Sequence, residues 1–382
     1  MADRTQKQRL SREEAIFFAS FIDSGECLTA AENIGSLSVV QKRLINKSGT
    51  DKKRVVYSFS PGENAVLKVI AHLCYRYDAH MPANLYSFRR DSSAKTAVRR
   101  IVSARGIDNM YAYKLDIRDY FNSIDPRLLL AGLRTLLTDD APLYAFFYNM
   151  LTADTAMFDG ALVHEQRGVM AGTPTSPFLA NVYLLPLDRY FERRGALYAR
   201  YSDDIILFAN TPEELSADRT AIRQMLEEHR LEINAEKEAV ALPHETWTFL
   251  GISYTNGAVD LSENTKRKLK GKIRRKARAL YRWKLRKGES DERAIRAFIR
   301  SINRKLYERP DDAHRFSWTR WFFPLVTVAD GLHEMDEYLV QYMRYVAYGG
   351  FGRSGYRLRY ETLKGYGFRP LVAAYYRYKK EP

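Results

Sequence analysis

Two adjacent aspartates, Asp203 and Asp204, lie between two apolar runs in the segment Ala-Arg-Tyr-Ser-Asp-Asp-Ile-Ile-Leu-Phe-Ala, residues 199–209. The flanking runs have the composition of buried strands, so the pattern predicts a hairpin over 197–209 with both carboxylates at its tip. Burying neighbouring carboxylates is costly unless a cation neutralises them. The segment therefore indicates either a cation site or an ordinary Asp-Asp turn.

A second strand-like segment, Tyr111 to Ile117, carries Asp116 at its end. Mg²⁺ is typically bound by one or two protein carboxylates, and substrate phosphates and water complete its octahedron. Two strand ends that bring Asp116 beside Asp203 would hold two ions, which stabilise the attacking and leaving oxygens of a phosphoryl displacement. Asp119 and Asp125 are weaker candidates, and Asp125 before Pro126 is more typical of a helix cap.

The excess positive charge is concentrated in one segment. The chain has 61 lysines and arginines against 46 aspartates and glutamates, a net charge of +15. Residues 264–309 hold 19 of these basic and 4 of these acidic residues, so they carry the whole excess. Such a surface would repel itself without a polyanion, which favours nucleic-acid binding over a merely solvated charged face.

The same segment predicts two amphipathic helices, because apolar residues recur in it at helical spacing. The inward residues expected in the first helix are Leu269, Ile273, Leu280 and Trp283. Those expected in the second are Ile295, Phe298, Ile299, Ile302 and Leu306.

Composition narrows the class of protein. With 382 residues, 46% of them hydrophobic, the chain is long enough for about two or three domains with a sizeable core. Its two cysteines, Cys27 and Cys74, exclude a disulfide framework and a cysteine-rich zinc site. No apolar run approaches the roughly 18 residues of a membrane span, and the first residues lack the apolar core of a signal peptide. We therefore expect a cytoplasmic protein with reduced thiols and no membrane partner.

The order of the expected elements indicates an α+β fold. Between residues 111 and 240 it is strand, helix, helix, strand, strand, helix, which is typical of a sheet with helices on one face. Helices are expected at 12–23, 37–44, 67–77, 127–137, 177–191 and 213–229. Strands are expected within 47–60, at 111–117, in the hairpin 197–209, and in a short hairpin of 247–254 and 257–261.

Several segments resemble motifs of reverse transcriptases, in that family's order and spacing. Tyr201-Ser202-Asp203-Asp204 resembles the tyrosine-X-aspartate-aspartate motif, and residues 114–125 resemble the first carboxylate motif. The motif that lies between these two in the family is resembled by residues 172–183, Gly-Thr-Pro-Thr-Ser-Pro-Phe-Leu-Ala-Asn-Val-Tyr. The resemblance is strongest to the glycine-X-proline-threonine-serine-proline form of retron and group II intron enzymes. Further resemblances are to two fingers segments at 47–54 and 84–90, to the next motif at 231–237, and to the primer-grip hairpin at 249–252.

The resemblance implies a right-hand polymerase with fingers, a palm and a helical thumb. The palm would be an antiparallel sheet with helices on one face. We expect N-terminal helices and fingers in 1–110, the palm and primer-grip hairpin in 111–262, a basic helical thumb in 263–309, and a helical C-terminal extension in 310–382. The extension is rich in tyrosine, with 10 of the chain's 26 tyrosines between residues 338 and 382.

The resemblance also implies roles at the catalytic centre. Asp116, Asp203 and Asp204 would be the catalytic carboxylates and would bind two Mg²⁺ ions, with Mn²⁺ as a substitute and help from the carbonyl of Ile117. Phe121 would be the bulky gate that excludes a ribose 2′-hydroxyl, with core packing as the alternative.

Cationic residues would contact the nucleotide and the nucleic acid. Lys47 and Arg54 would neutralise the incoming triphosphate, and Lys237 would either protonate pyrophosphate or be a solvated lysine. Arg89 and Arg90 would contact template or nucleotide, or be surface charges. The basic thumb would hold the template–primer backbone through Lys266, Arg267, Lys270, Arg274, Arg275, Arg278 and Arg282.

The chain departs from the family pattern beside the nucleotide site. The family usually has glutamine before the glycine of the motif at 172–183, whereas this chain reads Met170-Ala171-Gly172. Ala171 lacks the amide that braces the templating base pair and the nucleotide sugar. The substitution puts fidelity, template dependence or both in question.

The kind of reverse transcriptase follows from the remaining segments. We expect neither a ribonuclease H domain nor a cysteine- and histidine-rich endonuclease, since the chain has only 2 Cys and 7 His. The segment after residue 310 is similar to the tails of bacterial "unknown group" enzymes, many of them antiphage, and the nearest class is defence-associated type 2. This implies a structured non-coding RNA as template, a DNA primer or product, and deoxynucleoside triphosphates as partners, with the oligomeric state open.

Three alternatives stay open from the sequence. Ala171 favours a template-independent or loosely templated nucleotidyl transferase. An RNA-binding defence scaffold with an inactive site is opposed by the intact aspartates, and an RNA-directed RNA polymerase is opposed by Phe121. The stripe of Tyr338, Tyr342 and Tyr345 predicts helix packing, with base stacking or tyrosine priming as alternatives.

Overall fold

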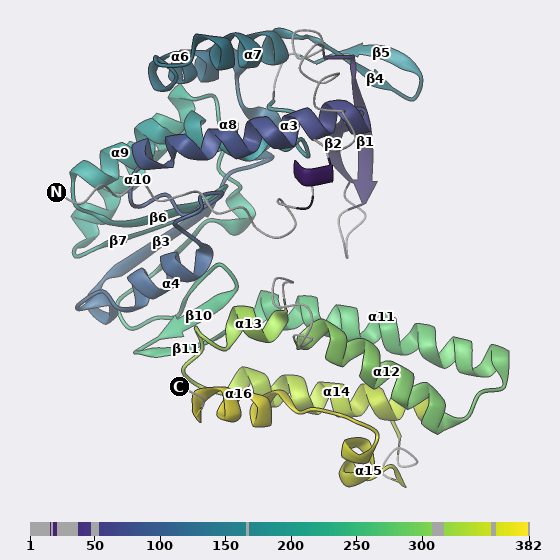
Figure 1. Cartoon of the computed structure of the whole chain (residues 1–382). Coiled ribbons are helices and arrows are strands. Elements are labelled where there is room, and N and C mark those ends of the chain that lie inside the picture. The colour runs from purple at the N-terminus through teal and green to yellow at the C-terminus, as the bar shows by residue number, and fades with distance from the viewer. Residues whose placement is uncertain are drawn as a thin grey trace. The chain divides into compact units, whose positions relative to one another are not determined.

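The computed structural model describes residues 16, 18–20, 37–46, 53–165, 168–307, 317–352 and 357–380. The chain divides into two compact units, Met1–Ala97 with Tyr111–Val240, and Val98–Met110 with Ala241–Pro382 (Figure 1). The four-part division expected from the sequence is finer than these two units and stays a prediction. The helix expected at 12–23 lies mostly outside the described residues.

In the first unit, a four-stranded sheet has the order β2-β1-β4-β5. Its strands are β1 (Val40–Asn46), β2 (Lys53–Ser58), β4 (Thr155–Phe158) and β5 (Ala161–His164). β1 pairs antiparallel with β2 and parallel with β4, so the strand expected within 47–60 is confirmed, whereas the helix expected at 37–44 is wrong. Pairing on both edges, together with packing of Val40 against Tyr57 and Ala156, overrides the helical spacing of its apolar residues.

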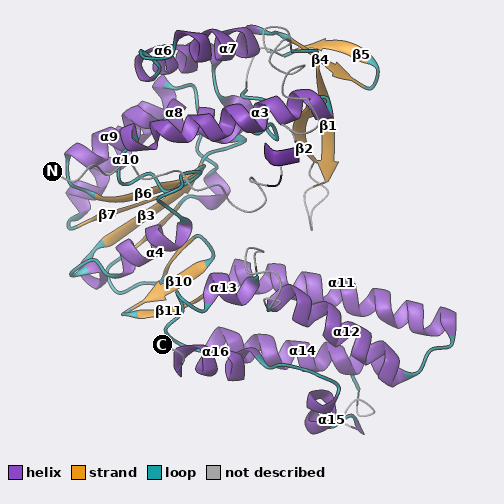
Figure 2. Ribbon diagram, in the orientation of Figure 1, coloured by secondary structure: helices purple, strands orange, loops and turns teal. Residues whose placement is uncertain are grey.

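The second sheet of this unit has the order β6-β7-β3-β8 and carries the carboxylates. Its strands are β3 (Tyr111–Asp116), β6 (Leu197–Tyr201), β7 (Asp204–Ala209) and β8 (Ala239–Ala241). β7 pairs antiparallel with both β3 and β6, as the sequence predicts. The helices α8 (Ser176–Tyr183), α9 (Leu185–Arg193) and α10 (Pro212–Glu228) lie on one face of this sheet (Figure 2).

The single helix expected at 177–191 is in fact two, α8 and α9, separated at Leu184. Pro186 lies at the start of α9, and proline lacks the N–H and clashes with the carbonyl four residues earlier, so one continuous helix cannot pass through it. The unit's remaining helices are α3 (Pro61–Cys74), η1 (Tyr75–His80), α5 (Tyr120–Ser123), α6 (Pro126–Leu136), α7 (Ala141–Thr152) and η3 (Ala235–Lys237), and α4 (Ala94–Val102) crosses the unit boundary.

The second unit contains η2 (Ile107–Asn109) and a three-stranded antiparallel sheet of β9 (Trp247–Phe249), β10 (Ile252–Thr255) and β11 (Ala258–Leu261). The expected strand at 247–254 is broken because Leu250 and Gly251 both have positive φ, 47° and 90°. The expected hairpin of two strands is therefore a sheet of three.

The described residues of the second unit also form a set of helices. They are α11 (Glu263–Lys287), α12 (Asp291–Leu306), α13 (Trp318–Phe322), α14 (Asp330–Tyr348), α15 (Tyr360–Gly365) and α16 (Leu371–Lys380). The inward residues expected in α12 are all buried, and so are Leu269 and Ile273 of α11. Leu280 and Trp283 are only half-buried, and Ala277 and Lys284 are buried in the same helix.

The tyrosine stripe of α14 packs within the unit. The rings of Tyr338 and Tyr342 lie 4.7 Å apart, those of Tyr342 and Tyr345 5.7 Å apart, and Tyr281 of α11 contacts Tyr345 at 5.6 Å. The packing interpretation of the stripe is confirmed. Among the described helices, none combines the length and apolar character needed to cross a membrane.

Candidate active site

The three aspartates expected to be catalytic lie at the end of β3, in the β6–β7 turn and at the start of β7. In the β3–β7 ladder, Asp116 stands opposite Asp204. The backbone N–H of Ile117 donates to the carbonyl of Asp203 at 3.1 Å, which extends the contact between the two chain segments beyond β3. The fold therefore brings Asp116, Ile117, Asp203 and Asp204 together at one edge of the sheet.

Burial and the neighbouring negative charges both oppose ionisation of Asp203 and Asp204. Burial raises the pKa of Asp203 to about 6, and the charges of Asp116 and Asp204 add to this effect. Burial also raises the pKa of Asp204, although Lys114, 3.6 Å away, opposes the shift. A cation at this edge would offset the cost of the clustered negative charge.

Lys237 provides one such positive charge. Its Nζ donates to both carboxylate oxygens of Asp116, at 2.7 and 2.8 Å. Burial lowers the pKa of Lys237, but the hydrogen bond and negative charge of Asp116 outweigh burial, so the pKa is raised overall. Lys237 is thus the last residue of η3, with an exposed side chain whose ammonium reaches the carboxylate of Asp116.

The turn that presents Asp203 is held by a serine from a distant segment. Ser202 has a positive φ of 61°, and its backbone N–H donates to Oγ of Ser87 at 2.9 Å. Ser87 in turn donates to Oδ1 of Asn181 at 2.9 Å, and Asn181 donates back to the carbonyl of Ser87 at 2.8 Å. The left-handed turn is therefore anchored to the loop before α4 and to α8.

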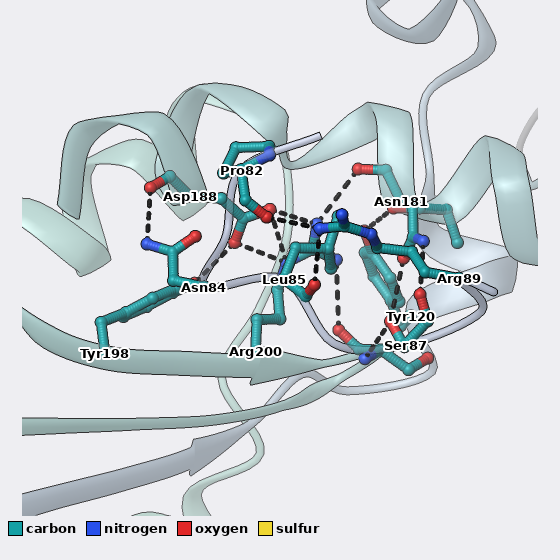
Figure 3. A network of polar contacts seen from close by, with 12 residues as sticks. Pro82, Asn84, Leu85, Ser87, Arg89, Tyr120, Asn181, Asp188, Tyr198 and Arg200 are labelled. Carbon is teal, nitrogen blue, oxygen red and sulfur yellow. Dashed lines mark hydrogen bonds and ion pairs between the residues drawn. The ribbon is translucent and has the colours of Figure 1, made fainter. Parts of the chain in front are cut away.

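A fully buried ion pair lies beneath the same turn. Arg200 and Asp188 both have no exposed side-chain surface. Nε of Arg200 donates to both oxygens of Asp188 at 2.8 and 3.1 Å, and Tyr198 donates to Asp188 at 3.0 Å (Figure 3). Burial raises the pKa of Asp188, and Arg200 opposes that shift. The pair fixes the strand that leads into the turn, and sequence reasoning missed it.

Gly172 and Ala171 lie against strand β2. Gly172 has φ 105°, and a Cβ on it would lie 3.2 Å from the carbonyl oxygen of Tyr57. The carbonyl of Ala171 accepts the N–H of Tyr57 at 2.8 Å, and the Ala171 side chain is 1% exposed. Only glycine fits the close approach at 172 without strain.

Phe121 is tied to the segment that precedes Ala171. Its carbonyl accepts the N–H of Val169 at 2.9 Å, and its ring meets the edge of Tyr120 at 5.8 Å. The half-buried ring also packs on the main hydrophobic core. A role as gate and a role in packing are both compatible with this position.

Two arginines share one face of the β1–β2 hairpin. Val56 lies 3.5 Å from the position of a Cβ on Gly172, and Arg54 points to the same face because side chains alternate along a strand. Arg43 is the cross-strand partner of Val56 and so lies on that face too. Because the sequence predicts a helix at 37–44, it does not place Arg43 on this face. Lys47 lies outside the described residues.

Arg89 and Arg90 are engaged within the protein. The Arg89 side chain is 8% exposed, and its Nη1 donates to the carbonyls of Pro82 and Leu85 at 2.7 and 3.1 Å (Figure 3). Arg90 donates to His72 at 2.7 Å. These contacts favour a structural role over direct contact with nucleic acid.

The basic residues expected on α11 fall into two groups. Lys266 and Lys270 both pair with Glu334 of α14. The other expected residues are exposed and form no ion pair within the described part of the chain: Arg267, Arg274, Arg275, Arg278 and Arg282. The second group is the one available to a polyanion.

The carboxylate edge fits a metal whose shell is completed by substrate. Within the described residues, no three histidine, cysteine or acidic side chains are grouped so as to hold an ion by themselves. Magnesium sites that use substrate phosphates need only one or two protein carboxylates. The raised pKa of Asp203 and the cation on Asp116 show that this edge favours positive charge.

Comparison with known proteins agrees with this geometry. A family model described as "Reverse transcriptase (RNA-dependent DNA polymerase)" matches residues 45–254, more than half of the chain. The Retron Mx65 reverse transcriptase of Myxococcus xanthus is 28% identical over 176 residues, covering 44% of this chain and 41% of that protein. The Retron Ec86 reverse transcriptase of Escherichia coli is 27% identical over 106 residues, covering 27% of this chain and 33% of that protein. The chain thus spans less than half the length of these relatives.

Among solved structures, apo telomerase from Candida tropicalis matches with a TM-score of 0.49 and 11% identity, covering 87% of this chain and 68% of that one.

Proposed function

Because the chain belongs to the reverse transcriptase family, we propose that it is an RNA-directed DNA polymerase that extends a primer 3′-hydroxyl with deoxynucleotides. The observation that carries the proposal is the placement of Asp116, at the end of β3, beside Asp203 in the β6–β7 turn, joined by the contact of Ile117 with Asp203. This geometry suits phosphoryl transfer between a hydroxyl and a triphosphate. We also propose that the fingers, palm, thumb and extension follow the sequence division at residues 110, 262 and 309.

Asp116, Asp203 and Asp204, with the carbonyl of Ile117, would hold two divalent ions, Mg²⁺ or Mn²⁺ in its place. When bound, such ions lower the cost of negative charge on the attacking and leaving oxygens. The chain's own residues position this centre: Ser87 holds the turn through the N–H of Ser202. Lys237 would supply a proton to the departing pyrophosphate.

The face of the β1–β2 hairpin that carries Arg43 and Arg54 would bind the triphosphate. Arg54 and Arg43 share the face of the hairpin that approaches Gly172, which supports a role for both in neutralising phosphate charge. Phe121 would act as the gate against a ribose 2′-hydroxyl, and its backbone contact with Val169 ties it to the segment of Ala171. Lys47 stays part of this proposal from the sequence alone.

The template would be a structured non-coding RNA, and the setting antiphage defence in the cytoplasm, with defence-associated type 2 enzymes as the nearest class. The exposed arginines of α11 support an extended contact with a nucleic-acid backbone. The relatives named as retron reverse transcriptases are proteins of bacteria, which supports placing this chain among bacterial reverse transcriptases.

A second candidate is a nucleotidyl transferase that uses its template loosely or not at all. Ala171 favours it, since its side chain is buried and carries no group that can hydrogen-bond to a base pair or sugar.

One experiment separates the two candidates. The protein is purified with its bound nucleic acid, supplied with Mg²⁺ and labelled deoxynucleotides, and any product is sequenced, beside an Asp203→Asn control. We expect DNA complementary to one co-purifying RNA, made by the wild type and absent with the variant. DNA without a complement would support the transferase. Equal synthesis by the variant would refute the role of Asp203.

A further inference from the structure

Lys237 and Asp116 form a contact that the proposed reaction would have to break. The ammonium reaches both oxygens of Asp116, at 2.7 and 2.8 Å, and so takes the position between them. A divalent ion bound to the same carboxylate would lie within a few ångströms of this ammonium, where like charges repel. The proposed metal site and the observed ion pair therefore compete for one carboxylate.

The backbone around Lys237 is fixed, whereas its side chain is accessible. The N–H of Asn234 donates to the carbonyl of Asp116 at 2.8 Å, and the N–H of Lys237 donates to the carbonyl of Asn234 at 2.9 Å. The Lys237 side chain is 56% exposed, against 7% for Asp116. The lysine thus reaches from solvent onto a buried carboxylate, and its side chain can leave without moving η3.

Loss of the ammonium without replacement would be unfavourable. Asp116 is buried, and Asp203 and Asp204 lie beside it, so Lys237 offsets charge that would otherwise destabilise the strand ends. The Nζ of Lys114 lies 3.6 Å from one carboxylate oxygen of Asp204. This is a single contact, and it is longer than the two contacts of Lys237 with Asp116.

We infer that Lys237 is a displaceable counter-ion of the metal site: its ammonium neutralises Asp116 until divalent ions bind, and their binding releases it toward the triphosphate. This inference rests on the proposed function for the identity of the ions. It couples metal binding to the freeing of the residue that would protonate pyrophosphate. It also implies that Lys237 lowers the affinity of the site for metal ions when no nucleotide is bound.

The test measures Mn²⁺ binding directly, with no template, primer or nucleotide present, by following free Mn²⁺ by electron paramagnetic resonance. Lys237→Met removes the ammonium, and Lys114→Met is the matched control, since it removes a cation near the same carboxylates that does not occupy Asp116. We expect Lys237→Met to bind Mn²⁺ at least about fivefold more tightly than the wild type, a factor typical of coupled binding. Lys114→Met should change the affinity less.

Thermal unfolding provides the second readout. Without metal, Lys237→Met should melt below the wild type, and saturating Mn²⁺ should remove the difference. Lys237→Arg, which keeps the charge, should retain near wild-type Mn²⁺ affinity and covers the case in which Lys237→Met does not fold. Unchanged or weaker Mn²⁺ binding by Lys237→Met, or equal tightening by Lys114→Met, would overturn the inference. A protein that shows the expected binding but makes no DNA would refute the proposed function alone.

Discussion

The carboxylate of Asp203 is placed where its charge costs the fold free energy. Burial and the charges of Asp116 and Asp204 raise its pKa to about 6, above the ordinary value of 3.8. The folded state therefore holds this proton more tightly than the unfolded state, so stability falls as pH rises from about 4 to about 6. Strain of this kind is expected where a site is built to receive a cation.

Replacing Asp203 by asparagine should stabilise the protein while removing activity. In metal-free buffer near pH 7.5, we expect Asp203→Asn to melt roughly 2–4 °C above the wild type, the shift for about 1 kcal/mol in a domain of this size. The difference should shrink as the pH falls below 6 and vanish near 4, since the wild-type carboxyl is then protonated. Differential scanning fluorimetry across this range measures it. A variant that melts below the wild type at pH 7.5 would contradict the electrostatic account.

At the scale of elements, the hairpin β6–β7 depends on a charge pair buried beneath it. Arg200 and Asp188 are both inaccessible to solvent, and Tyr198 and Asn181 also contact the pair. Removing one partner of a buried pair leaves an uncompensated charge, which costs more than removing both. The pair thus links α9 to the strand that leads into the β6–β7 turn.

Asp188→Asn should lower the free energy of unfolding by about 3–5 kcal/mol. Urea denaturation followed by circular dichroism measures this loss. Asp139→Asn is the control, because its pair with Arg76 is exposed and should be worth less than about 1 kcal/mol. The double variant Asp188→Leu with Arg200→Met should recover stability relative to Asp188→Asn. Equal losses for Asp188→Asn and Asp139→Asn would show that an unpaired charge in the buried site costs no more than one in the exposed site.

The elements that the sequence predicted correctly are those with a strong local signal. β3 is a largely apolar run that ends at Asp116, β7 is an apolar run that begins at Asp204, and α10 has a clear cap and polar face. The helix expected at 37–44 is instead β1, which pairs with its hairpin neighbour β2 and, in parallel, with β4, a strand far away in the sequence that no local pattern points to. At the site, Asp116 and Asp203 stand out by their position after apolar runs, whereas the pairing of Arg200 with Asp188 or of Ser202 with Ser87 depends on contacts that no local pattern encodes.

Over the whole molecule, the net charge of +15 resides in residues 264–309. The structure divides the expected contacts there by partner: Lys266 and Lys270 share Glu334, whereas Arg274 and Arg278 are exposed and have no acidic partner among the described residues. Cations already neutralised by a carboxylate release fewer counter-ions from a bound nucleic acid. Two lysines and two arginines on one helix should therefore differ in their effect on RNA affinity.

The double variant Arg274→Gln with Arg278→Gln should weaken RNA binding and flatten its dependence on salt. Each lost phosphate contact reduces the slope of log affinity against log salt by about 0.7–0.9, so the two together should reduce it by about 1.5. Lys266→Gln with Lys270→Gln is the matched control and should reduce the slope less, because Glu334 offsets those charges. Fluorescence anisotropy with a labelled RNA, repeated at several salt concentrations, gives both slopes. If the lysine variant flattened the slope as much as the arginine variant, exposure would not decide which cations bind RNA; an unchanged slope in both would place the nucleic-acid contact outside this face of α11.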